Sequence, residues 1–174
     1  MSIPEGTAEH RAAASTRTGA RVAIVVVSDK RTIATDESGP LARALLTEAG
    51  HAITAFALLP NDEAGTRAHV AQLIARDDVD VVLLSGGTGL SAKDRTVEAV
   101  RPLMEKELPG FGELFRMISF QEQIGTSAIL TRALAGGING KLIVSLPGSK
   151  AAVDLALTRI LIPELPHLMH ELRR

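Results

Sequence analysis

The clearest chemical signal in this sequence is a cluster of three glycines within a four-residue span. Gly86, Gly87 and Gly89 follow the apolar run 79–84, which suits a strand buried on both faces. Glycines cost chain entropy and add no packing, so such a cluster needs a geometric reason. A tight turn usually needs a single glycine, whereas several allow backbone N–H groups to approach an anion closely. The cluster therefore predicts a phosphate-binding loop at the carboxyl end of a strand.

Two aspartates could add a metal ion to this loop. Asp62 lies in the polar segment 60–62, and Asp94 lies shortly after the glycines. Two carboxylates that face a phosphate site can hold Mg²⁺ against a nucleotide triphosphate. Taken singly, each aspartate fits a capping role at a turn or helix start better. Together with the glycine loop, the pair is also a candidate metal-binding pair.

The elements that must position these residues alternate regularly in the first half of the chain. Residues 21–28, 51–59 and 79–84 are apolar runs typical of strands, and residues 38–49 and 64–75 have helical spacing, with Ser38 as a candidate cap. This β-α-β-α-β order implies parallel strands, right-handed crossovers and helices on both faces. Ligands of such sheets bind outside the carboxyl ends of the strands, where the loops 60–62, 85–94 and 147–149 are expected.

The second half adds helices and an antiparallel pair. Asn139-Gly140 stands between the apolar runs 135–138 and 141–146, and this pair favours a hairpin turn, so an antiparallel edge is expected to join the sheet. The remaining helices are predicted over residues 96–106, 111–123, 151–161 and 163–174. The expected fold is a three-layer αβα sandwich with a mostly parallel sheet. Residues 20–174 are expected to form one domain, preceded by a flexible tail at residues 1–19.

Composition excludes several classes of function. The 174 residues carry a formal net charge of −1 and only 2% aromatic residues, which disfavours nucleic-acid binding. No apolar run approaches the length of a membrane span. With no Cys, the chain has no disulfide, thiolate nucleophile or thiolate metal ligand, which fits a cytoplasmic location. Phe111, Phe115 and Phe120 lie in one segment, and either core packing or a subunit contact would explain them.

Two rival nucleotide motifs fit less well. Residues 87–92 formally match the dinucleotide fingerprint G-x-G-x-x-A, but the strand expected about twenty residues later is replaced by the sequence Pro-Gly-Phe-Gly-Glu at residues 109–113. A nicotinamide cofactor is therefore the weakest hypothesis. The Walker motif G-x-x-x-x-G-K-[ST] is absent from the sequence.

Three ordered blocks stand out in the whole chain. They are residues 84–89 with Lys93-Asp94, Thr96 and Glu98; residues 109–116; and Leu146-Pro147-Gly148-Ser149. Their order and spacing resemble the MoaB/MogA family of molybdenum-cofactor biosynthesis proteins. Residues 119–120, 124–127 and 131–133 resemble the MoaB branch more than MogA. The resemblance covers residues 20 to about 165.

The resemblance implies molybdopterin adenylyl transfer. In this family ATP and molybdopterin give adenylyl-molybdopterin and pyrophosphate, with Mg²⁺. Asp62 and Asp94 match the family's essential acidic positions and are assigned to Mg²⁺ and phosphate organisation. The substrate- and nucleotide-binding residues that it implies are Ser28, Asp29, Ser85, Gly86, Gly87, Thr88, Gly89, Glu113, Arg116, Pro147, Gly148, Ser149 and Lys150.

The resemblance also implies a homo-trimer or a hexamer, which would account for the Phe cluster, and transfer of product to a molybdenum-insertion protein. This sequence departs from the family at Val97, where Pro is common; only the helix start should be affected. Two functions therefore stay open. One is an active adenylyltransferase, and the other is a non-catalytic molybdopterin-binding or scaffold protein of the same pathway.

Overall fold

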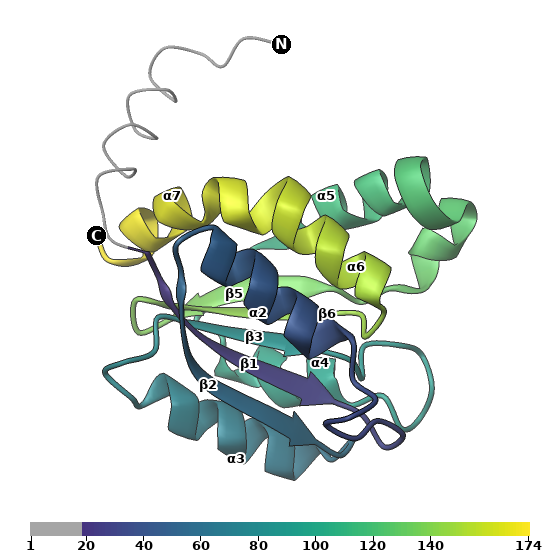
Figure 1. The fold of residues 1–174 in the computed structure, drawn as a ribbon, viewed down its shortest axis with the longest axis horizontal. Coiled ribbons are helices and arrows are strands. Elements are labelled where there is room, and N and C mark those ends of the chain that lie inside the picture. The colour runs from purple at the N-terminus through teal and green to yellow at the C-terminus, as the bar shows by residue number, and fades with distance from the viewer. Residues whose placement is uncertain (1–18) are drawn as a thin grey trace, which may run out of the picture.

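The computed structural model describes residues 19–174, and six strands of this part form one sheet (Figure 1). The strands are β1 (Arg21–Val27), β2 (Ala52–Leu59), β3 (Val81–Ser85), β4 (Lys106–Glu107), β5 (Leu134–Ile138) and β6 (Lys141–Leu146). Their order across the sheet is β2-β1-β3-β6-β5-β4. β2, β1, β3 and β6 are parallel, and β5 pairs antiparallel with both β6 and β4. The predicted fold class is confirmed.

The centre of the sheet is apolar on both faces. β3 and β1 are almost wholly made of Val, Ile, Ala and Leu, and every residue of β3 is buried. Such runs favour a strand that is covered on both sides, because no alternation with polar residues is needed. The register pairs Val26 with Ser85 and Ser85 with Leu146, so β1, β3 and β6 end at the same edge. The loops that follow these strands are therefore neighbours.

The antiparallel edge forms where the sequence predicted a hairpin. Asn139 and Gly140 join β5 to β6 with φ angles of 51° and 71°, the left-handed conformation that a type I′ turn requires. β4 extends this edge by two residues, Lys106 pairing with Gly137 and Glu107 with Gly136. This short strand was not predicted, since Lys106 was assigned to the end of a helix.

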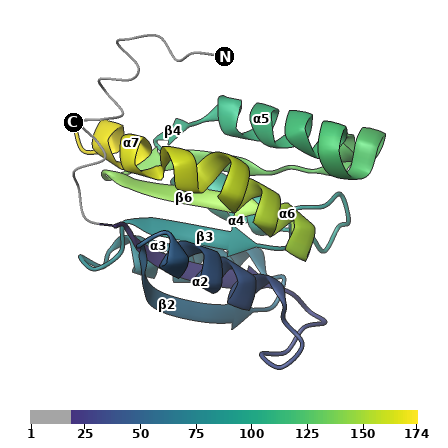
Figure 2. The same cartoon turned by 45° about the horizontal axis from the view of Figure 1, so that its top comes forward.

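Helices cover both faces of the sheet, as predicted. α2 (Ser38–Glu48), α5 (Pro109–Ser119), α6 (Lys150–Leu155) and α7 (Ile162–Leu172) pack on one face, and α3 (Glu63–Ile74) and α4 (Thr96–Val100) on the other (Figures 1 and 2). The alternate residues of β1 divide accordingly, with Val22 and Ile24 in one buried cluster and Ala23 and Val25 in the other. The three-layer arrangement is confirmed.

Several helix boundaries differ from the predicted ones. The helix predicted over 96–106 stops at Val100 and continues as a 3₁₀ turn, η1 (Arg101–Leu103), because Pro102 has no N–H for an α-helical bond. α5 ends in a π-helical turn, η2 (Phe120–Ile124), followed by the 3₁₀ segment η3 (Gly125–Leu130). A second π-helical segment, η4 (Ala156–Leu161), joins α6 directly to α7. The first residue of α2 is Ser38, and its cap is supplied by Asp36, which accepts from the N–H groups of Ser38 and Gly39 at 3.1 and 3.0 Å.

The predicted flexible tail lies, apart from Gly19, outside the described residues. Within residues 19–174, every helix is too short or too polar to cross a membrane.

Candidate functional site

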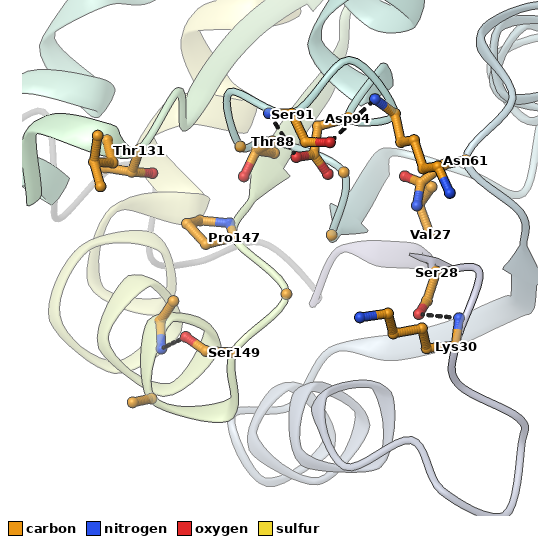
Figure 3. A pocket seen from close by; sticks show the side chains of 18 of the residues that line it. Val27, Ser28, Lys30, Asn61, Thr88, Ser91, Asp94, Thr131, Pro147 and Ser149 are labelled. Atoms are coloured by element: carbon orange, nitrogen blue, oxygen red, sulfur yellow. Dashed lines mark hydrogen bonds between the residues drawn. The ribbon is translucent and has the colours of Figure 1, made fainter. Parts of the chain in front are cut away.

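A pocket of about 760 Å³ opens at the edge where β1, β3 and β6 end (Figure 3). Segments from four strand-end loops, those after β1, β2, β3 and β6, surround it, as expected for ligands of an open α/β sheet. The strand ends and the loops that follow them supply one part of its wall, which is mostly polar: Val27, Ser28, Asp29, Lys30, Arg31, Asn61, Gly86, Gly87, Thr88, Gly89, Ser91, Lys93, Asp94, Pro147, Gly148 and Ser149. Figure 3 places Thr88 and Asp94 together on one side, with Pro147 and Ser149 across the opening from Asn61.

Backbone geometry explains the first two glycines of the loop. Gly86 and Gly87 have φ angles of 108° and 65°, which side-chain-bearing residues rarely adopt. A Cβ on Gly86 would lie 2.1 Å from the carbonyl oxygen of Val27, so this loop and the end of β1 touch backbone to backbone. The glycines thus let two strand ends meet and leave the loop backbone open to the pocket, as the phosphate prediction requires.

Asp94 lies within this loop. Its Oδ2 accepts a hydrogen bond from the backbone N–H of Ser91 at 3.2 Å, and a Cβ on Gly89 would stand only 2.7 Å from the same oxygen. The third glycine therefore makes room for the carboxylate. Asp94 is half-buried and lines the pocket, which places one of the two predicted catalytic carboxylates beside the glycines.

Arg132 fixes the glycine loop from behind. Its guanidinium donates to the carbonyl oxygens of Thr88 at 3.2 Å and Asp94 at 3.1 Å, and it forms an ion pair with Glu98 on α4. The hydrogen bond from Arg132 lowers the pKa of Glu98, outweighing the smaller effect of burial. The segment 131–133 entered the sequence analysis only through the family resemblance, and the structure assigns it this mechanical role.

The loop after β2 brings Asn61, and not Asp62, to the pocket. The Oδ2 of Asp62 accepts from the N–H of Gly65 at 2.6 Å, which makes Asp62 the N-cap of α3, and Asp62 is exposed outside the pocket wall. Asn61 lines the pocket. The predicted pairing of Asp62 with Asp94 therefore needs correction. At the start of α3 the side chain of Asp62 points away from the pocket, and the alternative role as a helix cap describes it.

Asp29 and Ser28 organise the loop after β1. The Oδ1 of Asp29 accepts from the N–H of Asn61 at 2.8 Å, and this bond lowers the pKa of Asp29. The hydroxyl of Ser28 accepts from the N–H groups of Lys30 and Arg31 at 3.2 and 3.1 Å. Both predicted residues line the pocket, where they hold neighbouring loops in place.

The loop after β6 supplies the opposite wall. Pro147, Gly148 and Ser149 line the pocket, and Ser149 caps α6 by accepting from the N–H of Ala152 at 3.2 Å. Gly148 lies against the glycine loop, since a Cβ there would be 3.2 Å from the Cα of Gly86. Lys150 is exposed and lies outside the pocket wall.

Three other predicted residues lie away from the opening. Ser85 is buried beneath the glycine loop, and its hydroxyl donates to Ser38 at 3.3 Å. Glu113 and Arg116 line a separate pocket of about 260 Å³ between α5 and the start of β5. The family-like block that contains Glu113 and Arg116 did not indicate this location, because the sequence does not show that α5 directs these side chains away from the glycine loop.

The pocket also has an apolar wall that sequence reasoning missed. Phe115, Ile124 and Leu130 line it from α5, η2 and η3, together with Ser119, Gln123, Ser127, Thr131, Ala151 and Ala152. The sequence analysis left Phe115 to core packing or a subunit contact, and no local signal indicates that η2 and η3 return to the strand ends. Lys30, Arg31 and Lys93 are missed cations of the polar wall.

Oxygen atoms near Gly87 suit a small divalent cation carried by phosphate. Asn61 Oδ1 and Thr96 Oγ1 are buried and have no hydrogen-bond partner among the described residues, and a Cβ on Gly87 would lie 2.6 and 2.2 Å from them. Within residues 19–174, no three His, Cys, Asp or Glu side chains cluster as a metal site. One carboxylate, Asp94, with neutral oxygens is the kind of donor set that Mg²⁺ uses when phosphates supply further ligands.

Comparison with known proteins agrees with this fold. Residues 23–167 match the family model described as "Probable molybdopterin binding domain". This match defines the class as a molybdopterin-binding domain on a three-layer α/β fold.

Individual relatives narrow the class. The chain is 50% identical over 152 residues to molybdenum cofactor biosynthesis protein B of Halalkalibacterium halodurans, an alignment that covers 87% of this chain and 89% of the relative. A crystal structure of a molybdenum cofactor biosynthesis protein B has a TM-score of 0.87 and 48% identity, covering 90% of this chain and 97% of that one. The tungsten cofactor synthesizing protein MoaB from Pyrococcus furiosus has a TM-score of 0.82 and 34% identity, covering 91% and 99%. The chain belongs to the molybdenum cofactor biosynthesis protein B (MoaB) family, which confirms the predicted branch.

Proposed function

We propose that this protein transfers the adenylyl group of ATP to the terminal phosphate of molybdopterin, giving adenylyl-molybdopterin and pyrophosphate. The observation that carries the proposal is one pocket of about 760 Å³ that joins the glycine loop and Asp94 to an apolar wall on α5, η2 and η3. The polar half suits phosphates, and the apolar half suits a flat ring. The family match to a molybdopterin-binding domain supports the choice of pterin.

The proposed reaction requires little covalent chemistry from the protein. A phosphate oxygen of molybdopterin attacks the α-phosphorus of ATP and forms the new P–O bond, while the bond to the bridging oxygen breaks and pyrophosphate leaves with its electron pair. A phosphate monoester is largely dianionic at neutral pH, since its second pKa is about 6, so no general base is required. The task is to hold two anions in line and to neutralise their charge.

The residues divide this task. The N–H of Gly86 donates to the carbonyl oxygen of Leu146, so the N–H groups of Gly87, Thr88 and Gly89 are the ones that donate to phosphate oxygens, and the cations Lys30, Arg31 and Lys93 offset the negative charge. Asp94 and the Oδ1 of Asn61 would hold Mg²⁺, which supplies charge neutralisation on the phosphates when it is bound. The apolar wall excludes water from one side of the pocket, which strengthens each of these electrostatic contacts.

The test compares Asp94→Ala with Asp62→Ala. We expect Asp94→Ala to lower the rate of pyrophosphate release from Mg-ATP and molybdopterin by about a hundredfold or more. Asp62→Ala removes a carboxylate from the neighbouring loop but outside the pocket, so it should keep the wild-type rate. A wild-type rate for the Asp94 variant would refute its assigned role.

A second candidate function is molybdopterin binding without turnover. The observation that favours it is that the side chain closest to Gly87 from the loop after β2 is the neutral amide of Asn61, while the carboxylate of Asp94 lies beside Gly89. Calorimetric titration separates the candidates. Retained pterin affinity with no heat from Mg-ATP would favour the binding protein, and heat from both ligands followed by pyrophosphate release would favour the enzyme.

We further propose that the protein self-associates, as a trimer or a hexamer, through the apolar face of α5, η2 and η3. Six large apolar side chains of this region are between 47% and 81% exposed: Leu114, Met117, Phe120, Ile124, Ile129 and Leu130. Large exposed apolar side chains on consecutive elements favour a protein interface. Met117→Glu should lower the mass measured by sedimentation to that of a monomer. An unchanged mass would place the interface elsewhere.

Transfer of product to a molybdenum-insertion protein stays a prediction.

A further inference from the structure

We infer that Arg31 is the anchoring cation for a phosphoryl group in this pocket, held ready by the buried carboxylate of Asp36. This inference deepens the proposed function, on which it rests, by naming a binding residue that neither the family resemblance nor the glycine motif indicated. It depends on three observations, namely the fixed position of the guanidinium, its free donors and its place beside two strand-end loops.

A buried polar network fixes the guanidinium. Its Nη1 donates to the hydroxyl of Ser38 at 2.9 Å and to Oδ1 of Asp36 at 3.5 Å. Ser38 in turn donates to the same Oδ1 at 2.9 Å, and the side chain of Asp36 is 0% exposed. A carboxylate taken out of water needs its partners, so the network resists rearrangement. The side chain of Arg31 is therefore held in position, unlike the side chain of an unpaired surface arginine.

The free donors of the guanidinium remain available to a ligand. Arginine has five N–H donors, and the two on Nη1 are used by Ser38 and Asp36. The single N–H on Nε and the two on Nη2 have no hydrogen-bond partner among residues 19–174. The side chain is 32% exposed and lines the pocket. A fork of unused donors on a fixed cation matches the oxygens of a phosphoryl group.

Arg31 also lies where two phosphate-binding loops meet. A Cβ on Gly148 would be 3.8 Å from Nη1 of Arg31 and 3.2 Å from the Cα of Gly86. The network continues into the strand below the glycine loop, since the hydroxyl of Ser85 donates to Ser38 at 3.3 Å. A phosphoryl group seated on the glycine loop would thus be within reach of the guanidinium.

The other cations of the pocket differ from Arg31 in this respect. Lys30 and Lys93 line the pocket but are exposed, and no side chain among residues 19–174 forms an ion pair with their ammonium groups. An ammonium on a long exposed stem loses conformational entropy when it binds an anion. Among the described residues of the pocket wall, Arg31 is the cation whose position the fold has already set.

The experiment titrates inorganic pyrophosphate into the full-length protein by calorimetry. We expect Arg31→Gln to weaken pyrophosphate binding about tenfold or more, and Arg31→Lys to give an intermediate loss, because lysine keeps the charge but lacks the planar fork. The matched control is Arg43→Gln, which removes a cation on α2 that stacks over Phe56 away from the pocket. Wild-type affinity in a folded Arg31→Gln protein would overturn the inference.

A double-mutant cycle tests the role of Asp36 as a positioning residue. Asp36→Asn should weaken pyrophosphate binding severalfold in the wild-type background and have no further effect in the Arg31→Gln background. A purely structural role would give the same loss in both backgrounds, and that outcome would overturn the part assigned to Asp36. If the wild-type protein bound neither pyrophosphate nor Mg-ATP, the proposed function would fail as well, so the two failures are distinguishable.

Discussion

At the scale of single residues, two adjacent residues in the loop after β2 have different roles. Asn61 lines the pocket, and its backbone N–H is held by Asp29 at 2.8 Å. Asp62 caps α3 through the N–H of Gly65. A helix start orients its capping side chain along the helix axis, so the next residue upstream is the one presented to the strand ends. Which polar side chain serves the ligand is therefore decided by where α3 begins.

Asp62→Ala tests this division of duties through stability. Loss of the cap should lower the free energy of unfolding by about 1 kcal/mol. Denaturant unfolding followed by far-ultraviolet circular dichroism measures the change. Asp62→Asn, which keeps an acceptor at the cap, is the control and should lose only a few tenths of a kcal/mol. A large loss of nucleotide affinity with unchanged stability would contradict the capping role.

At the scale of elements, the glycine loop depends on a clamp from a distant segment. Arg132 joins the carbonyl oxygens of Thr88 and Asp94 to Glu98 on α4, although these residues are far apart in sequence. A loop with three glycines has high conformational freedom, so without the clamp it would bind anions at a greater entropy cost. The clamp therefore serves the binding site as well as the fold.

Arg132→Gln should weaken Mg-ATP binding about tenfold, because the loop must be ordered on binding. Isothermal titration measures the affinity. Arg101→Gln removes a comparable arginine that pairs with Glu107 on the exposed edge of the sheet, and it should leave nucleotide affinity unchanged. Equal affinity losses in the two variants would point to a general charge effect and against the clamp.

At the scale of the whole molecule, Asp80 ties the chain together at the edge opposite the pocket. Its buried side chain accepts from Arg21 on β1 at 2.7 Å and from Arg173 beyond α7 at 2.6 Å. Burial alone would raise the pKa of Asp80, but the hydrogen bonds from Arg21 and the charge of Arg173 outweigh it and lower the pKa below 3.8. This ion-pair network joins the first strand to the last helix.

Asp80→Asn should lower the free energy of unfolding at pH 7 by about 1–2 kcal/mol, a value at the low end for ion pairs because both arginines are partly exposed. Since the folded pKa is below the unfolded one, the contribution is full above about pH 5 and is lost as the pH falls through the folded pKa. Urea unfolding of both proteins at several pH values should therefore show their difference shrinking in acid. A difference that grows in acid would refute this role of Asp80.

Much of this architecture is readable from local sequence. The apolar runs of β1 and β3, the Asn139-Gly140 turn and the glycine loop are set by residues that lie close together in the chain, so the sheet, its hairpin edge and the three strand-end loops were predicted. These predictions succeeded because side-chain periodicity and backbone sterics act over a few residues.

Other features depend on contacts between distant segments, and only the tertiary structure decided them. The sequence predicted a helix that extends to Lys106, whereas pairing with Gly137 places that residue in β4. The sequence also predicted that Asp62 and Asp94 act as a pair. It did not indicate Arg31, because the buried carboxylate that holds this arginine cannot be identified from the residues next to it. The sequence by itself determined the main strands and helices and where their strand-end loops meet. Packing determined which side chains face the pocket, because the direction of a side chain in a loop is fixed by its neighbours in space.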